Sequence, residues 1–134
     1  MHYRRLALRY TELAGHRRLE ALGAAAVRQL PLAAPEWRPA ADLYESNGSL
    51  EIRVDLPGVP EDGLDVTLYD DVLVISGDRP CRMPPGEVVF HTMEIPYGPF
   101  RLEVPVPAAV EADRIAAHYE GGFLQVTLPK RRAS

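Results

Sequence analysis

The chain has 134 residues, a formal net charge of −4, 46% hydrophobic residues and 25% charged residues. This composition is ordinary for one globular domain and does not favour a disordered chain, and the acidic balance lacks the basic footprint of a nucleic-acid-binding protein. No apolar run approaches the ~18 residues of a membrane-spanning helix, and a single cysteine, Cys81, excludes an internal disulfide. We therefore expect a soluble, cytoplasmic protein.

Residues 1–36 differ in charge from the rest of the chain. Six Arg and three Glu give them a balance of +3, whereas nine basic and sixteen acidic residues give the remainder −7. Apolar residues recur at helical spacing on both sides of Gly15, and Pro31 and Pro35 end the pattern. This spacing predicts an amphipathic N-terminal arm of one or two helices. Its apolar face comprises Tyr3, Leu6, Tyr10, Leu13, Leu19 and Leu22. The alternatives are a helix packed permanently on its own domain and, because the segment is rich in Arg, an organellar transit peptide.

A run of short strands is predicted after this arm. In residues 50–55, 64–69 and 123–128, apolar and polar residues alternate with the period of a half-buried strand. Residues 72–75 are apolar throughout, which predicts that both faces of that strand are covered. Two adjacent glycines, Gly121-Gly122, predict a tight hairpin turn before the last strand.

The connections between these strands are rich in turn-forming residues. A polar, proline-containing loop is expected at residues 78–87, and a short strand at residues 88–92 within the same connection. Asp70-Asp71 marks a tight turn, where aspartate is favoured for hydrogen bonds to its own backbone, and a catalytic carboxylate pair is the poorer interpretation. Short strands separated by such turns favour an all-β sandwich over residues 37–130, followed by a short tail at residues 131–134.

Five sequence motifs fall in the same order as in a known family. They are W-x-P-x-x-D-i-y-E at residues 37–45, v-D-l-P-G at 54–58, v-L-x-I-x-G at 72–77, y-G-x-F at 97–100 and A-x-x-x-n-G-v-L at 117–124. With these motifs the chain resembles the small heat-shock protein (alpha-crystallin domain) family. The resemblance implies an immunoglobulin-like antiparallel β-sandwich with a helical N-terminal arm. It also implies an ATP-independent chaperone, a holdase that binds partly unfolded proteins and prevents their aggregation.

The same resemblance implies a homodimer. In bacterial and plant members of the family, a strand in the long connection is exchanged with the partner, which places Val88, Val89 and Phe90 in the dimer interface. One position departs from the pattern. The family usually has Arg two residues after the Phe of y-G-x-F, where this chain has Leu102, and Arg101 is displaced by one. A one-residue shift moves a strand side chain to the opposite face, so an ion pair made by that Arg is not carried over.

Assembly beyond a dimer is a separate question. Many relatives end in an I-x-I/V tripeptide that plugs a groove on a neighbouring dimer. By position, the resemblance implies a groove lined by Val66, Leu68, Ile115 and Ala117. No such tripeptide follows Lys130. We therefore expect any larger oligomer to depend on the N-terminal arm.

The sequence contains no recognisable reactive centre. His2, His16, His91 and His118 lack the spacing of metal ligands, and Cys81 has no activating partner nearby in the sequence. The phosphate-binding motif G-x-x-x-x-G-K-[ST] is absent. We expect no enzymatic activity, no cofactor and no metal.

Two functions remain. In the first, a holdase, the six apolar residues of the arm form the client-binding surface. Apolar burial is non-directional, so such a surface tolerates many client sequences. In the second, a structural adaptor, the groove accepts one defined folded partner or its peptide.

Overall fold

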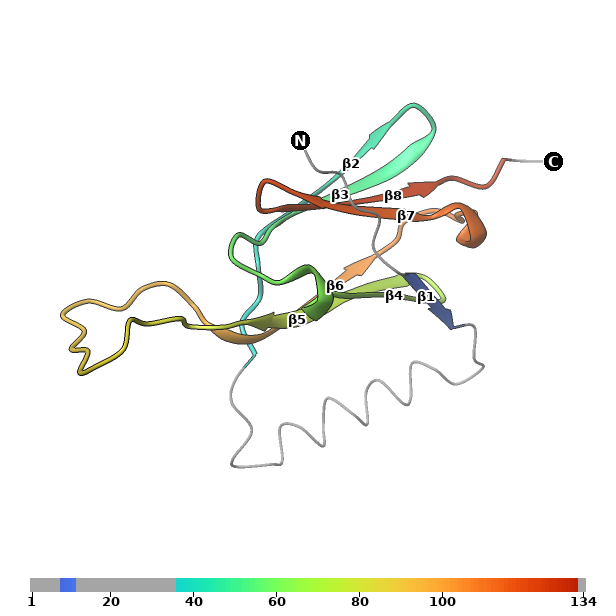
Figure 1. The fold of residues 1–134 in the computed structure, drawn as a ribbon. Coiled ribbons are helices and arrows are strands. Elements are labelled where there is room, and N and C mark those ends of the chain that lie inside the picture. The colour runs from blue at the N-terminus through green and yellow to red at the C-terminus, as the bar shows by residue number, and fades with distance from the viewer. Residues whose placement is uncertain (1–7, 12–35, 133–134) are drawn as a thin grey trace.

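The protein folds into two stacked β-sheets, seen edge-on in Figure 1. The structure is a computed structural model that describes residues 8–11 and 36–132. One four-stranded sheet has the order β2-β3-β8-β7 and the other the order β1-β4-β5-β6. The strands are β1 (Leu8–Thr11), β2 (Ala41–Ser46), β3 (Ser49–Asp55), β4 (Asp65–Tyr69), β5 (Val72–Arg79), β6 (Gly98–Pro105), β7 (Ala116–Glu120) and β8 (Phe123–Pro129). The predicted all-β sandwich is confirmed.

The hydrophobic core lies between the two sheets. In β3 and β8 every second side chain points inward, and Ile52 and Val126, which are register partners, are both fully buried. The facing sheet contributes inward side chains from β4, β5 and β6. The largest fully buried side chains are Phe100, Leu50, Ile52, Leu56, Leu73, Ile75, Leu102, Leu124 and Leu128. Since each contributes about 1.5–3 kcal/mol when fully buried, this cluster is the main source of stability.

The apolar run in β5 is buried on both faces, as its sequence predicts. Leu73 and Ile75 point into the core. Val74 points the other way and pairs across the ladder with Thr67 of β4, and both of these side chains are only 3% exposed. The outer face of this sheet is therefore covered around β4 and β5.

Local turn chemistry fixes the hairpins. Asn47 and Gly48 have φ values of 52° and 76°, and Gly121 and Gly122 have 60° and 84°. Positive φ at both central positions is what a type I′ hairpin turn requires. Asp70 also has a positive φ of 52° between β4 and β5. The prediction of a turn at Asp70-Asp71 is confirmed.

Gly77 of β5 packs against the backbone of Gly63 and against the ring of Phe100, its register partner in β6. A Cβ placed at Gly77 would lie 2.6 Å from the Gly63 carbonyl oxygen and 2.7 Å from Cζ of Phe100. The Phe100 ring thus occupies the space that any side chain at residue 77 would need. The glycine here is required by packing and not by its backbone dihedrals.

The helical prediction is wrong for residues 8–11. They form β1, which pairs in parallel with β4. A short amphipathic helix is marginal alone, whereas an available strand edge supplies backbone hydrogen bonds, and apolar Leu8 and Tyr10 also satisfy a period of two. Of the predicted client-binding residues, Tyr10 lies in β1. The others, Tyr3, Leu6, Leu13, Leu19 and Leu22, lie outside the described residues.

Candidate protein-interaction site

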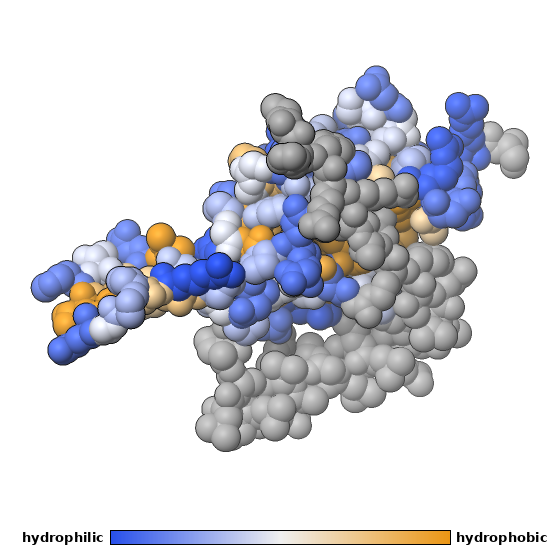
Figure 2. Space-filling view, in the orientation of Figure 1, coloured by the Kyte–Doolittle hydropathy of each residue, from blue (hydrophilic) through white to orange (hydrophobic). Residues whose placement is uncertain are grey.

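The connection between β5 and β6 carries most of the exposed apolar side chains of the described residues. It projects away from the sandwich in Figure 1, and apolar side chains gather at its far end in Figure 2. Val89 is 68% exposed and Phe90 48%. The exposed large apolar residues of this loop are Met83, Val88, Val89, Phe90, Met93 and Ile95. An apolar cluster of this kind on a surface marks an interaction site.

The short strand expected at residues 88–92 is not formed in this single chain. The predicted dimer-interface residues are exposed and lie in a segment without regular secondary structure. They are Val88, Val89 and Phe90. A strand needs a neighbour to accept and donate its ladder hydrogen bonds, and none lies beside this segment in the described part of one protomer. Their place in a dimer interface stays a prediction.

A free sheet edge offers such a neighbour. β2 ends its sheet and pairs only with β3 among the described strands, which leaves the backbone groups of its other side without a ladder. Leu43 of β2 is 43% exposed although its register partner, Ile52, is fully buried. β2 therefore presents both open backbone groups and apolar surface.

Arg79 fastens the base of the projecting loop. This residue ends β5 and is only 8% exposed. Its Nε and Nη2 atoms donate to the Pro96 carbonyl oxygen at 3.1 and 2.7 Å, and Nη1 donates to the Pro57 carbonyl oxygen at 3.2 Å. Because Arg79 precedes the loop and Pro96 ends it, one guanidinium group holds both ends of the loop together.

Trp37 contacts both the Arg79 side chain and the core next to the base of the loop. The Arg79 guanidinium lies over the Trp37 ring, 4.3 Å from its centroid, a cation–π geometry. The indole Nε1 donates to the Gly98 carbonyl oxygen at 3.1 Å, and the ring packs against Phe100 with centroids 5.3 Å apart. The loop base is thus anchored to the core through Trp37.

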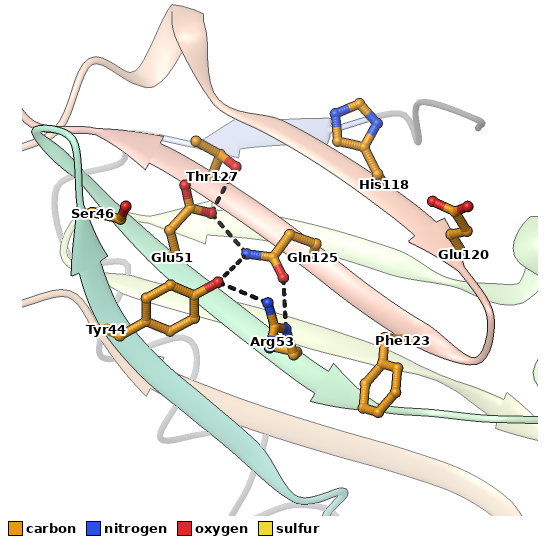
Figure 3. A pocket seen from close by; sticks show the side chains of 9 residues that line it. All are labelled: Tyr44, Ser46, Glu51, Arg53, His118, Glu120, Phe123, Gln125 and Thr127. Carbon is orange, nitrogen blue, oxygen red and sulfur yellow. Dashed lines mark hydrogen bonds between the residues drawn. The ribbon is translucent and has the colours of Figure 1, made fainter.

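A polar network covers the outer face of the sheet that contains β2 (Figure 3). Arg53 donates to the Gln125 Oε1 atom and to the Tyr44 hydroxyl, both at 3.1 Å. Gln125 and Thr127 each donate to Glu51 Oε2 at 2.8 Å. The side chains line a shallow hollow of about 460 Å³. They satisfy one another across three strands, so the network holds β2 in register with β3 and β8.

Tyr119 of β7 joins the hairpin to the turn after β3. Its hydroxyl donates to the Leu56 carbonyl oxygen. Burial is the largest effect on this phenol and raises the pKa of Tyr119 above its ordinary value, with the carboxylate of Glu61 adding to the rise. The neutral, hydrogen-bonded form is therefore the one that the fold stabilises.

The four predicted groove residues all lie in the core. Val66 and Leu68 are at most 3% exposed, Ile115 is 5% exposed and Ala117 is fully buried. The edge of β4 next to them is paired with β1. Their role as groove lining stays a prediction, because in this arrangement the chain covers that edge itself.

The departure at residue 102 is a change of face. Leu102 is fully buried, whereas Arg101 lies on the outward face, where its Nε donates to Glu103 Oε1 at 3.0 Å.

Sequence reasoning missed two contributors to the site, Arg79 and Leu43. Leu43 alternates with its neighbours as an edge strand should, but no spacing pattern indicates Arg79, because its acceptors are backbone carbonyl groups.

No group of three His, Cys, Asp or Glu side chains is placed to hold a metal ion within the described ranges. Cys81 is exposed and carries a free thiol. Among residues 8–11 and 36–132, no helix has the length and hydropathy needed to cross a membrane.

Most of the sequence matches a known family model. The model described as the Hsp20/alpha crystallin family matches residues 42–134. The chain belongs to this family. Its members are small heat-shock chaperones, which are not in general enzymes, and membership supports a chaperone role for this chain.

Individual relatives give the same assignment. A probable 15 kDa heat shock protein of Leptospira interrogans is 36% identical over 94 residues, which is 70% of this chain and 71% of the relative. Small heat shock protein C2 of Rickettsia felis is 29% identical over 93 residues, and this match spans only 60% of that protein's length.

Solved structures share the fold. Heat shock protein 16.0 of Schizosaccharomyces pombe is 32% identical with a TM-score of 0.65, covering 74% of this chain and 92% of the other. A small heat-shock protein from Xylella fastidiosa is 29% identical with a TM-score of 0.66, covering 75% and 92%.

Proposed function

We propose that the protein is an ATP-independent holdase that works as a homodimer and binds partly unfolded proteins. The observation that carries the proposal is that one protomer has both an exposed apolar segment and an open strand edge. The loop presents an exposed apolar segment at residues 88–92, and β2 presents an open edge. Each feature supplies what the other lacks.

In the proposed dimer, residues 88–92 of each protomer add as a strand to β2 of the other. The exchange is reciprocal, so one two-fold axis satisfies both edges at once. Apolar Val89 and Phe90 and the exposed Leu43 would become buried. The Arg79 contacts support this arrangement, because they fix where the loop leaves the sandwich.

Client binding rests on apolar surface without a chemical step. A partly unfolded protein exposes apolar side chains, and covering them removes area from water at about 25 cal/mol per Å². The predicted client-binding face is the arm, and the exposed loop residues Met93 and Ile95 add surface of the same kind. The sequence lacks a nucleotide phosphate-binding loop, which supports action without ATP hydrolysis.

Larger assembly is part of the proposal. The Xylella fastidiosa relative is described as having a distinct high order structure. We extend self-association beyond the dimer to this chain by way of its N-terminal arm.

The holdase proposal is tested by heating an aggregation-prone model protein with an equimolar amount of the full chain and no nucleotide. We expect light scattering from the client to be suppressed. Unchanged aggregation, with the chaperone candidate itself still soluble, would refute the proposal.

The dimer proposal is tested with two matched variants of the loop. Val89→Asp places a carboxylate in the exchanged segment, whereas Met83→Asp places one at an exposed apolar position outside it. Desolvating an unpaired carboxylate costs at least about 2 kcal/mol, so Val89→Asp should weaken the dimer at least about 30-fold. Size-exclusion chromatography with light scattering should show a smaller mass for Val89→Asp than for the unaltered protein, whereas Met83→Asp should keep the mass of the unaltered protein, a dimer or a larger assembly of dimers. Equal masses for the two variants would contradict the strand exchange.

The adaptor alternative needs an open groove, and the burial of Val66 and Leu68 beneath a paired β4 edge does not favour it. A pull-down separates the two functions. Many proteins captured only after heating support a holdase, and one stoichiometric native partner would support an adaptor.

A further inference from the structure

The outer face of the sheet that contains β4 is covered at its centre. Val74 and Thr67 point away from the core, yet each is only 3% exposed. On the outer face of the other sheet, Glu51 and Thr127 lie in the two central strands and are only half-buried. Side chains of neighbouring strands thus leave such positions partly exposed, so Val74, an apolar residue, has a further cover.

Residues 12–35 begin and end at opposite edges of this same sheet. β1 ends at Thr11 and lies on one edge, next to β4. At the other edge, Trp37 forms a bridge with Phe100 of β6. The inner face of the sheet is filled by the core. The chain between the two edges therefore passes over the outer face or around one end of the sheet.

The strand register locates the direct path between these edges. Thr11 is level with Val72 of β5, whereas Trp37 is level with Gly77. At about 4.8 Å per strand spacing and about 3.3 Å per residue, four spacings across the sheet and the step from residue 72 to residue 77 give a diagonal of about 25 Å. Its midpoint falls on β5 between residues 74 and 75. Val74 is the outward-pointing residue at that midpoint.

We propose that the outer face of this sheet is the docking surface for residues 12–35 of the same chain. The apolar spacing in this segment predicts a helix, and residues 16–30 would span about 22 Å as a helix, which fits the diagonal. The predicted apolar face of the segment, with Leu13, Leu19 and Leu22, would supply the contact to Val74. Side chains that the proposed function assigns to clients would thus have a resident partner in their own chain. The inference goes beyond that function, and its test uses neither a client nor a dimer.

The charges of the two surfaces agree with this docking. Residues 12–35 contain three Arg and two Glu, a balance of +1. The outward positions of β4, β5 and β6 hold three acidic residues and one basic residue, a balance of −2. They are Asp65, Asp78, Glu103 and Arg101. Opposite charges on surfaces in contact attract within the Debye length of about 8 Å at physiological ionic strength.

Thiol labelling at residue 74 measures the cover. The reporter is Val74→Cys in a Cys81→Ser background, because the exposed thiol of Cys81 would react as well. The open reference is Phe123→Cys in the same background, since Phe123 is 49% exposed on the outer face of the other sheet. With a water-soluble maleimide, we expect residue 74 to react at least about tenfold more slowly than residue 123. Equal rates, with the tryptophan fluorescence of the folded protein unchanged, would overturn the proposal.

Two substitutions within residues 12–35 identify what covers Val74. At helical spacing Leu22 lies on the apolar face, and Ala24 lies about 160° around the helix from it. In the reporter chain, Leu22→Asp should speed labelling of residue 74 at least about tenfold, because an unpaired carboxylate is costly to bury against Val74. Ala24→Asp adds the same charge on the other face and should change the rate by no more than about twofold. Equal rates in the two variants would show that this segment is not the cover.

Dilution separates the chain's own segment from that of a second copy. A contact within one chain does not depend on protein concentration, whereas cover by a neighbour is lost as an assembly dissociates. We expect the labelling rate of residue 74 to stay constant over about a hundredfold dilution, into the range where light scattering shows dissociation. A rate that rises with dissociation would assign the cover to a second copy and overturn docking within the chain.

Discussion

Replacing Arg79 by methionine is the sharpest test of how the loop is held. The substitution keeps most of the apolar stem and removes three hydrogen bonds, two to Pro96 and one to Pro57. It also removes the guanidinium that lies 4.3 Å from the Trp37 ring centroid. Hydrogen bonds from a charged donor contribute about 1.5–3 kcal/mol each and a cation–π contact about 0.5–2 kcal/mol, but truncation also relieves the cost of burying the charge. We expect a net loss of about 2–4 kcal/mol in the free energy of unfolding.

Arg79→Lys should lose less stability than Arg79→Met. A lysine ammonium can reach one carbonyl oxygen but cannot reproduce the planar fork, so we expect a loss of about 1–2 kcal/mol. The control is Arg101→Met, which makes the same substitution at an arginine whose side chain is 36% exposed and paired with Glu103. Exposed ion pairs contribute little, so this variant should stay within about 0.5–1 kcal/mol of the unaltered protein.

Equilibrium urea unfolding, followed by the fluorescence of the sole tryptophan, Trp37, measures all three variants. Limited proteolysis in the native state adds a local readout, since a released loop should be cleaved faster within residues 80–97 in Arg79→Met. If Arg79→Met and Arg101→Met lose the same small amount of stability and their loops are cleaved at the same rate, Arg79 does not fasten the loop.

Further predictions concern the core and the dependence of stability on pH. Gly77→Ala forces a Cβ to within 2.6 Å of the Gly63 carbonyl oxygen and should cost about 1–3 kcal/mol in urea unfolding, whereas Gly63→Ala, which meets no atom within 4 Å, should cost little. Burial raises the pKa of Tyr119, so above about pH 10 the unfolded chain releases a proton that the folded chain retains, and stability should fall as the pH rises. Tyr119→Phe should flatten this fall and should also cost about 1 kcal/mol at neutral pH, because the Leu56 carbonyl loses its donor. A fall of equal slope in Tyr119→Phe would assign the effect to another group.

Much of the sandwich could be predicted from short-range patterns. In β3, Leu50, Ile52 and Val54 alternate with polar residues because one face of the strand is buried and the other meets solvent. Each tight turn carries its own chemical requirement, such as the positive φ at both residues of Gly121-Gly122. These constraints act within a few residues, so they are visible in the sequence.

The parts that could not be predicted depend on partners far away in the chain. The spacing of apolar residues in the N-terminal segment fits a helix, but the open edge of β4 offers Leu8–Thr11 backbone hydrogen bonds that local periodicity cannot report. Arg79 is the last residue of β5 and has no charged partner at a recognisable spacing in the sequence. Its acceptors are the carbonyl groups of Pro57 and Pro96, which any residue type could supply.

The distribution of free and covered strand edges orders the steps of assembly. In the sheet that contains β4, β1 covers one edge. At the other edge, the backbone carbonyl of Trp37 accepts a hydrogen bond from the Arg101 N–H, and the backbone N–H of Trp37 donates one to the Pro99 carbonyl oxygen. In the second sheet, β7 is a short outer strand, whereas β2 combines an open ladder with the exposed side chain of Leu43. An incoming strand therefore gains most at β2, and the apolar loop of a second copy is a strand source of suitable composition. Dimerisation through β2 should thus precede any larger assembly, and dilution of an oligomer should release dimers before monomers.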